Sequence, residues 1–227
     1  MRPFFSSSNQ IESFIALGLV LVAAQLTQGA ACAQEAGAQS APDLLPYTNL
    51  YTADEVGKNF ARQQMTPHGN SKLAFEILVP RGWQSAVSEV DPGQLARDDQ
   101  APVMMAEFYP SNADDAWAVT LYMRLPEEVS LATFIDRMVQ RDGGTLVTRQ
   151  ARQMTDRAVE EAIIRANNED LGPMLRRVTV MRRGEFLFVV IGEAAEEEYS
   201  KYKRSLGVLA TSFTPIPLES ESEEGQF

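Results

Sequence analysis

The chain has 227 residues, with 20 Lys and Arg against 31 Asp and Glu, and its formal net charge is −11. Such an acidic surface disfavours nucleic acid and anionic lipid as partners, because both require a basic footprint. The length is sufficient for one well-filled hydrophobic core.

The first 33 residues have the pattern of a secretory signal peptide. Residues 14–24 form an apolar run, which suits a signal and is too short for a membrane span of about 20 residues. Ala31-Cys32-Ala33 has the small-x-small form that signal peptidase cleaves, so we expect cleavage before Gln34 and a periplasmic mature protein. The alternative is a buried apolar helix in a cytosolic protein. The Ala-, Gln-, Ser- and Gly-rich residues that follow favour export.

Cys32 is the only cysteine of the chain. Cleavage before Gln34 removes it, and with it disulfides, thiolate nucleophiles and cysteine-bound metals. A lipoprotein signal would instead attach a lipid to Cys32 and anchor the protein to a membrane. Gly29 occupies the position where such signals usually carry an aliphatic residue, so we expect cleavage rather than a lipid anchor at Cys32.

The remaining chain divides into three parts. Residues 34–50 lack a steady periodicity and are predicted to be a linker. Residues 51–213 are predicted to form a single α/β domain. Residues 214–227 contain Glu219, Glu221, Glu223 and Glu224 beside Ser and Gly, which predicts a disordered acidic tail.

The first half of the predicted domain combines one helix with three strands. Thr52 and Glu55 form a capping box, which predicts a helix that continues to about Met65 and stops at Pro67. A strand over 73–80 follows, and the turn after it presents Trp83. Further strands are predicted over 103–109 and 117–125. In the second of these, alternate apolar residues share one face: Trp117, Val119, Leu121, Met123 and Leu125.

In the second half, Ser130 caps a helix whose apolar stripe marks one buried face: Leu131, Phe134, Ile135, Met138 and Val139. Gly143-Gly144 ends this helix. Strands are predicted over 145–153, 157–166, 174–182 and 185–193, with a tight turn at Arg183-Gly184. The continuous apolar run 186–191 indicates a central strand covered on both faces. The last helix is predicted over 195–212, with one apolar face: Tyr199, Tyr202, Leu206 and Leu209.

This order of elements, together with four short segments, resembles the PsbP-like superfamily, which includes the bacterial DcrB-type envelope proteins and the Mog proteins. The segments are 75–83, 131–135, 184–190 and 209–213, and the resemblance covers roughly 70–213. It implies an α+β domain: an α/β/α sandwich with a mostly antiparallel sheet flanked by helices. Such families are on the whole non-enzymatic, and they assist the assembly of larger complexes or are uncharacterised.

The residues offer little for catalysis. His68, the only histidine, lies in a Pro- and Gly-flanked loop, and no nucleophile elbow accompanies it. Glu160 and Glu161 are adjacent on a predicted strand, so their side chains point to opposite faces. Two Asp pairs lie in predicted loops without calcium-site spacing: Asp98, Asp99, Asp114 and Asp115. We therefore predict no enzyme, no metal site and no cofactor.

Two features remain as candidates for interaction. Trp83 is a packing residue or a ligand-stacking residue, and packing at the rim of the core is favoured. Arg176, Arg177, Arg182 and Arg183 flank the stretch 178–181, where we expect them to lie on a solvated hairpin.

The sequence thus predicts a non-enzymatic periplasmic interaction or assembly factor that docks on an envelope complex, such as secretion or conjugation machinery. Its partner is a protein, not nucleic acid, and no membrane span is predicted. The alternative is a periplasmic carrier of a small ligand or lipid, with a cleft near Trp83. A third reading, an enzyme using the loop carboxylates, also stays open.

Overall fold

The structure of the protein is a computed structural model that describes residues 51–89, 102–111, 115–126, 128–153, 157–168, 171–183 and 186–216. The predicted signal peptide, Cys32, the linker, and residues 217–227 of the predicted tail lie outside the described residues. So do Asp98, Asp99 and Asp114. No helix in the described ranges is both long and apolar enough to cross a bilayer.

The described residues form helices and strands in the following order. The amino-terminal half contains α2 (Ala53–Asn59), β1 (Phe60–Met65), β2 (Phe75–Pro80), β3 (Trp83–Val87), β4 (Val103–Pro110) and β5 (Ala116–Arg124). The carboxyl-terminal half contains α4 (Leu131–Arg141), β6 (Thr145–Gln153), β7 (Ala158–Asn168), β8 (Gly172–Arg183), β9 (Phe186–Ala195), α5 (Tyr199–Ser212) and β10 (Thr214–Pro215). Two short 3-10 turns, Pro67–Gly69 and Ser71–Leu73, connect β1 to β2.

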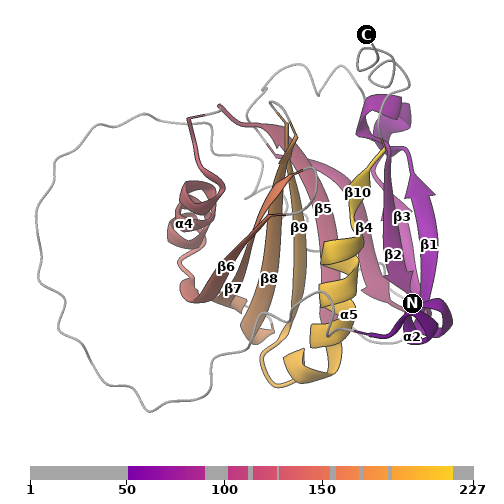
Figure 1. Cartoon of the computed structure of the whole chain (residues 1–227). Coiled ribbons are helices and arrows are strands. Elements are labelled where there is room, and N and C mark those ends of the chain that lie inside the picture. Colours follow the sequence, from indigo (N-terminus) through magenta and orange to yellow (C-terminus); the bar gives the residue numbers. More distant parts are fainter. Residues whose placement is uncertain are drawn as a thin grey trace, which may run out of the picture. The chain divides into compact units, whose positions relative to one another are not determined.

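The strands form two antiparallel sheets, which confirms the predicted α+β sandwich (Figure 1). The larger sheet has seven strands in the order β3-β4-β5-β9-β8-β7-β6, and the smaller has three in the order β1-β2-β10. Helix α4 packs on one face of the large sheet, against β7 and β8. Helix α5 packs on β2, β8 and β9, on the opposite face. The prediction of one sheet between helices is therefore refined, because a small sheet lies beside α5.

The predicted α4 helix is confirmed in its cap and in its buried face. The Ser130 hydroxyl accepts a hydrogen bond from the Thr133 amide, at 3.0 Å, as an N-cap residue does. Ile135 and Met138 are buried against the sheet. All five residues of the predicted stripe pack in this layer, and so do the four alternating residues of β5 and Leu125, which follows that strand directly. Helical and strand periodicity therefore predict side chains of the same layer, on one face of the large sheet.

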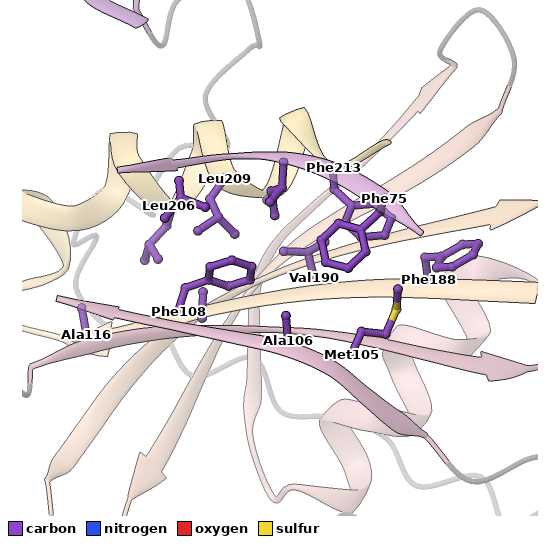
Figure 2. Close-up of a cluster of buried hydrophobic side chains, with 14 of the residues drawn as sticks. Phe75, Met105, Ala106, Phe108, Ala116, Phe188, Val190, Leu206, Leu209 and Phe213 are labelled. Carbon is purple, nitrogen blue, oxygen red and sulfur yellow. The ribbon is translucent and has the colours of Figure 1, made fainter. Parts of the chain in front are cut away.

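The second core layer lies between the large sheet, α5 and the small sheet (Figure 2). Phe213 follows α5 directly, and its ring centroid lies 4.8 Å from that of Phe75 and 5.6 Å from that of Phe188. Leu206 and Leu209 of α5 are fully buried in the same layer. The ring of Phe213 thus connects β2, β9 and the end of α5, and we expect such stacked rings to contribute beyond their buried area.

The predicted helix from Thr52 to Met65 is wrong in its second half. The capping box of Thr52 and Glu55 is present, but α2 ends at Asn59. Residues 60–65 instead form β1, which pairs with β2 so that Phe60 lies opposite Pro80 and Met65 opposite Phe75. A short helix gains little from its own hydrogen bonds, whereas the strand buries Phe60 and Met65. Pairing with β2 therefore determines that residues 60–65 form a strand rather than a continuation of the helix.

Two smaller boundaries also differ from the predictions, and strand β3 was not predicted. Helix α5 begins at Tyr199, so Glu196–Glu198 precede it. Thr214 and Pro215 pair with Glu76 and Phe75 of β2, so ordered structure continues past residue 213. Strands β2 and β3 belong to different sheets, and Gly82 in the turn between them has a φ of 86°, which favours glycine.

The predicted β8–β9 hairpin is confirmed by its register, with Arg183 opposite Phe186.

We predict that Gly192→Ala destabilises the domain by about 1–3 kcal/mol, as overpacking does. A Cβ atom at Gly192 of β9 would lie 2.8 Å from Leu206 Cδ2 and 3.2 Å from Leu206 Cβ, so α5 would have to move away from the sheet. Urea unfolding followed by circular dichroism measures the change.

The matched control is Gly57→Ala in α2, where a Cβ atom meets nothing within 4 Å. We expect this variant to be as stable as the parent or slightly more stable, because Ala favours helix. Equal stability of both variants and the parent would show that α5 does not pack as closely on β9 as the structure has it.

Candidate functional site

Trp83 lies in a cluster of aromatic and charged side chains at one end of α5. Its ring is edge-on to that of Tyr202, with centroids 6.2 Å apart and an angle of 68° between the rings. The Tyr202 hydroxyl donates to Asp115 Oδ1 at 2.7 Å. Lys201 Nζ lies 3.1 Å from Asp115 Oδ2 and 4.6 Å from the centroid of the Tyr202 ring. We call Trp83, Asp115, Lys201 and Tyr202 the Trp83 cluster.

The three ionisable groups of the Trp83 cluster, Asp115, Lys201 and Tyr202, do not change their charge near neutral pH. Burial works against the charge of Asp115, but hydrogen bonds from Tyr202 and Lys201 outweigh it and hold the Asp115 pKa below its ordinary value. Contacts with Tyr202 and Asp115 raise the pKa of Lys201. Burial raises the pKa of Tyr202. At pH 7 the cluster therefore holds an ammonium, a carboxylate and a neutral phenol, which suits recognition better than proton transfer.

The four predicted arginines do not form one surface patch. Arg176 and Arg177 are neighbours on β8, so their side chains point to opposite faces of the sheet. Both are buried, so the prediction that they lie on a solvated hairpin is wrong for these two. The Arg182 guanidinium donates to the Val129 carbonyl at 2.6 Å, and Arg183 is half-buried.

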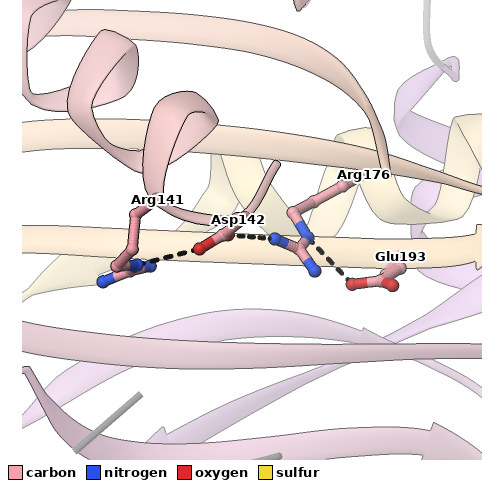
Figure 3. A network of polar contacts seen from close by, with 4 residues as sticks. All are labelled: Arg141, Asp142, Arg176 and Glu193. Atoms are coloured by element: carbon pink, nitrogen blue, oxygen red, sulfur yellow. Dashed lines mark hydrogen bonds and ion pairs between the residues drawn. The ribbon is translucent and has the colours of Figure 1, made fainter. Parts of the chain in front are cut away.

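Arg176 lies on the α4 side and joins that helix to the sheet (Figure 3). Its Nε donates to Glu193 Oε2 at 2.9 Å, and its Nη1 donates to Asp142 Oδ2 at 2.6 Å. Glu193 lies opposite Arg176 on β9, and Asp142 is the C-cap residue of α4. Arg141 also pairs with Asp142, at 2.8 Å. These contacts explain why Arg176 is internal.

Arg177 lies on the α5 side, in a second buried group of charges. Its Nη2 donates to Glu161 Oε1 at 2.8 Å, and Arg152 Nη2 lies 2.8 Å from Glu161 Oε2. Arg177 and Glu161 are each 1% exposed at the side chain. Within the described part of the chain, Arg177 Nε and Nη1 have no hydrogen-bond partner. Burial also raises the pKa of nearby Tyr199 to about 12, although Arg177 opposes that rise.

The other residues considered for chemistry are engaged in structural contacts. His68 Nε2 lies 3.1 Å from the Met104 carbonyl oxygen. Glu160 Oε1 lies 3.4 Å from Arg149 Nε, on the face opposite Glu161, as the alternation predicts. Of the four loop aspartates, Asp115 is described, and it belongs to the Trp83 cluster. In the ranges that the structure describes, no three His, Cys, Asp or Glu side chains gather as metal ligands.

Glu107 is a residue that the sequence reasoning missed. It lies on β4 between Ala86 of β3 and Val119 of β5, on the α4 face of the large sheet. Burial raises its pKa, and no cation among the described residues pairs with it. The sequence could have revealed it, because Glu107 is the only charged residue in the predicted strand 103–109 and its neighbours are apolar.

We predict that Glu107→Gln stabilises the domain at pH 7. The raised pKa means that folding disfavours the charged carboxylate, so stability is lost as pH rises from the unfolded-state pKa of about 4.3 through the folded-state value. Below that range the carboxyl is neutral in both states, and the difference between variant and parent should vanish. Thermal unfolding from about pH 3 to pH 8 measures it, a range that extends below the unfolded-state pKa of Glu, with exposed Glu197→Gln as control. A lower Tm for Glu107→Gln at neutral pH would contradict the prediction.

We also predict that Glu161→Gln destabilises the domain by about 3–5 kcal/mol, because it leaves two arginine side chains at a buried site without their carboxylate. The double variant Arg177→Met with Glu161→Leu should recover part of this loss. Urea unfolding of both variants and the parent tests it.

The control for this pair is the neighbouring Glu160→Gln, which removes a partly exposed ion pair and should lower stability by at most about 1 kcal/mol. Equal losses for the two glutamate variants would mean that the Glu161 group is no more important than an ordinary surface pair.

No protein-family model matches the chain, and no curated protein is similar to it. Solved structures that it resembles include PsbP (CyanoP) from the cyanobacterium Synechocystis sp. PCC 6803, at 15% identity over 70% of this chain and 93% of that one, with a TM-score of 0.48. Another is LpqN of Mycobacterium tuberculosis, described as involved in cell envelope biogenesis, at 15% identity over 74% and 98% of the two chains, with a TM-score of 0.45.

A variant of Mog1 is also similar, at 13% identity over 70% of this chain and 98% of that one, with a TM-score of 0.41. The structures that resemble the chain therefore include PsbP and Mog1, which represent two of the three groups that the sequence resemblance names.

Proposed function

We propose that the protein is a non-enzymatic periplasmic interaction or assembly factor, which docks on a protein complex of the cell envelope through the Trp83 cluster. The observation that carries this proposal is the half-buried indole of Trp83, held edge-on by Tyr202 beside a fixed ion pair. Tryptophan and tyrosine are enriched among the residues that dominate binding energy in protein interfaces.

The contacts within the Trp83 cluster favour binding because they hold it in one arrangement. Tyr202 is buried and its hydroxyl is fixed by Asp115, so the surface against which Trp83 packs is rigid. Lys201 is exposed and presents a charge next to the Tyr202 ring. A partner that buries Trp83 would lose little side-chain freedom on binding, since the cluster is already ordered.

The buried charges support a structural role rather than catalysis for most ionisable groups. Arg176, Arg177 and their carboxylates join elements of the core, and the Asp115 carboxylate is held by its two donors. The proposal of export rests on the amino-terminal pattern of residues 1–33. Sequencing the amino terminus of the protein from its host tests it: a start at Gln34 supports free periplasmic release, and a lipid-modified Cys32 would show an anchor.

The test of the docking proposal is cross-linking in intact cells followed by recovery of the tagged protein from the envelope fraction. We expect one protein complex to be recovered with the parent, and at least about tenfold less of it with Trp83→Ala, which removes a side chain of the type that dominates interface energies. Lys201→Ala serves as a second variant, because its exposed side chain can be removed without disturbing the core. The control is exposed Gln64→Ala on β1, which should leave recovery unchanged.

Two outcomes would overturn the proposal. Equal recovery with Trp83→Ala and Lys201→Ala, both folded by circular dichroism, would remove the cluster from the interface. A small molecule retained in native mass spectrometry of the parent and lost in Trp83→Ala would instead favour the carrier alternative.

A further inference from the structure

The large sheet carries an apolar surface at its β3–β4–β5 end, on the same face as α4. We call it the β4–β5 patch, and its residues lie on two neighbouring strands: Met104, Glu107, Tyr109, Trp117, Leu121 and Met123. Helix α4 packs against β7 and β8, nearer the other end of the sheet (Figure 1). Tyr109 is 38% exposed, and the other five are half-buried. Apolar side chains that lie side by side and are only partly covered form a candidate interaction site.

The register places Glu107 in the middle of this patch. Met104 lies opposite Leu121, and Glu107 lies opposite Val119. On its other side Glu107 lies opposite Ala86, and Tyr109 lies opposite Gln84 of β3. The carboxylate therefore has apolar neighbours on both adjacent strands. Within the described chain it has no cationic partner, unlike the carboxylates of Glu160, Glu161 and Glu193.

Apolar surroundings disfavour the charged form of a carboxyl group unless a cation lies beside it. A partner with a Lys or Arg side chain would supply that cation, and apolar residues beside it would cover the aromatic and methionine side chains. A second copy of this chain related by a two-fold axis over Glu107 would bring two carboxylates together, which is repulsive. Charge complementarity thus favours a basic partner over self-association.

We propose that the β4–β5 patch binds a protein segment that presents one Lys or Arg side chain between apolar residues. The patch lies on the face of the large sheet that α4 covers further along, whereas Trp83 packs in the layer on the other face. The two surfaces are therefore distinct, and this proposal does not depend on docking through the Trp83 cluster. A protein that uses both would be held between two partners or two parts of one partner.

The test uses three synthetic peptides with identical apolar residues that differ only in a central Lys, Gln or Glu. Binding to the purified protein is followed by the NMR shifts of the β3, β4 and β5 backbone amides. We expect the Lys peptide to bind at least about tenfold more tightly than the Gln peptide, and the Glu peptide to bind most weakly. In Glu107→Gln this preference for Lys should disappear, whereas in the control Glu197→Gln it should persist.

A direct readout separates recognition of the charge from simple packing. The pKa of the Glu107 carboxyl should fall when the Lys peptide binds and stay unchanged with the Gln peptide, as followed by NMR titration of the side chain. Equal affinity of the Lys and Gln peptides, or no binding of the Lys peptide, would overturn the proposal. So would a concentration-dependent dimer that Tyr109→Ser abolishes, because it would assign the patch to a second copy.

Discussion

Strands β8 and β9 are buried on both faces, and this constraint organises the rest of the domain. A sheet with two buried faces needs a covering layer on each side. Helix α4 supplies one layer, and α5 with the small sheet supplies the other. The position of Phe213 follows from the second layer, since its ring fills the space between β2 and β9. The end of the large sheet formed by β3, β4 and β5 is less completely covered, and both candidate interaction surfaces lie there.

Charge in the interior of this domain is divided between the two layers. Arg176 joins β8 to β9 and to the end of α4, while Arg177 joins β8 to Glu161 on the opposite face. Buried ion pairs add little net stability, because removing charges from water offsets their attraction. Breaking one is far more damaging, since an unpaired charge stays behind. These pairs therefore disfavour alternative registers of β7, β8 and β9, in which the carboxylates would miss their arginines.

The two candidate surfaces differ in their electrostatics. In the Trp83 cluster every charge has a partner, and the aromatic rings are held by those contacts. In the β4–β5 patch, Glu107 has no partner among the described residues, and burial raises its pKa. The contacts within the Trp83 cluster hold its side chains in place before a partner binds. In the β4–β5 patch, a basic partner would supply the positive charge that the Glu107 carboxylate does not have beside it among the described residues. Both lie on the β3–β4–β5 side of the large sheet, on opposite faces.

The sequence by itself determined the elements whose side chains repeat with a clear period. The stripe of α4, the alternation of β5 and the apolar run of β9 predict their own buried faces, because periods of 3.6 and 2 reflect local backbone geometry. The alternation rule that separates Glu160 from Glu161 also separates Arg176 from Arg177, so their opposite faces could have been predicted. Only the tertiary structure decided that residues 60–65 form a strand, that Trp83 and Asp115 both meet Tyr202, and that Glu107 has no cation beside it among the described residues. These features depend on pairing between distant segments, and local sequence does not encode which segment will lie alongside.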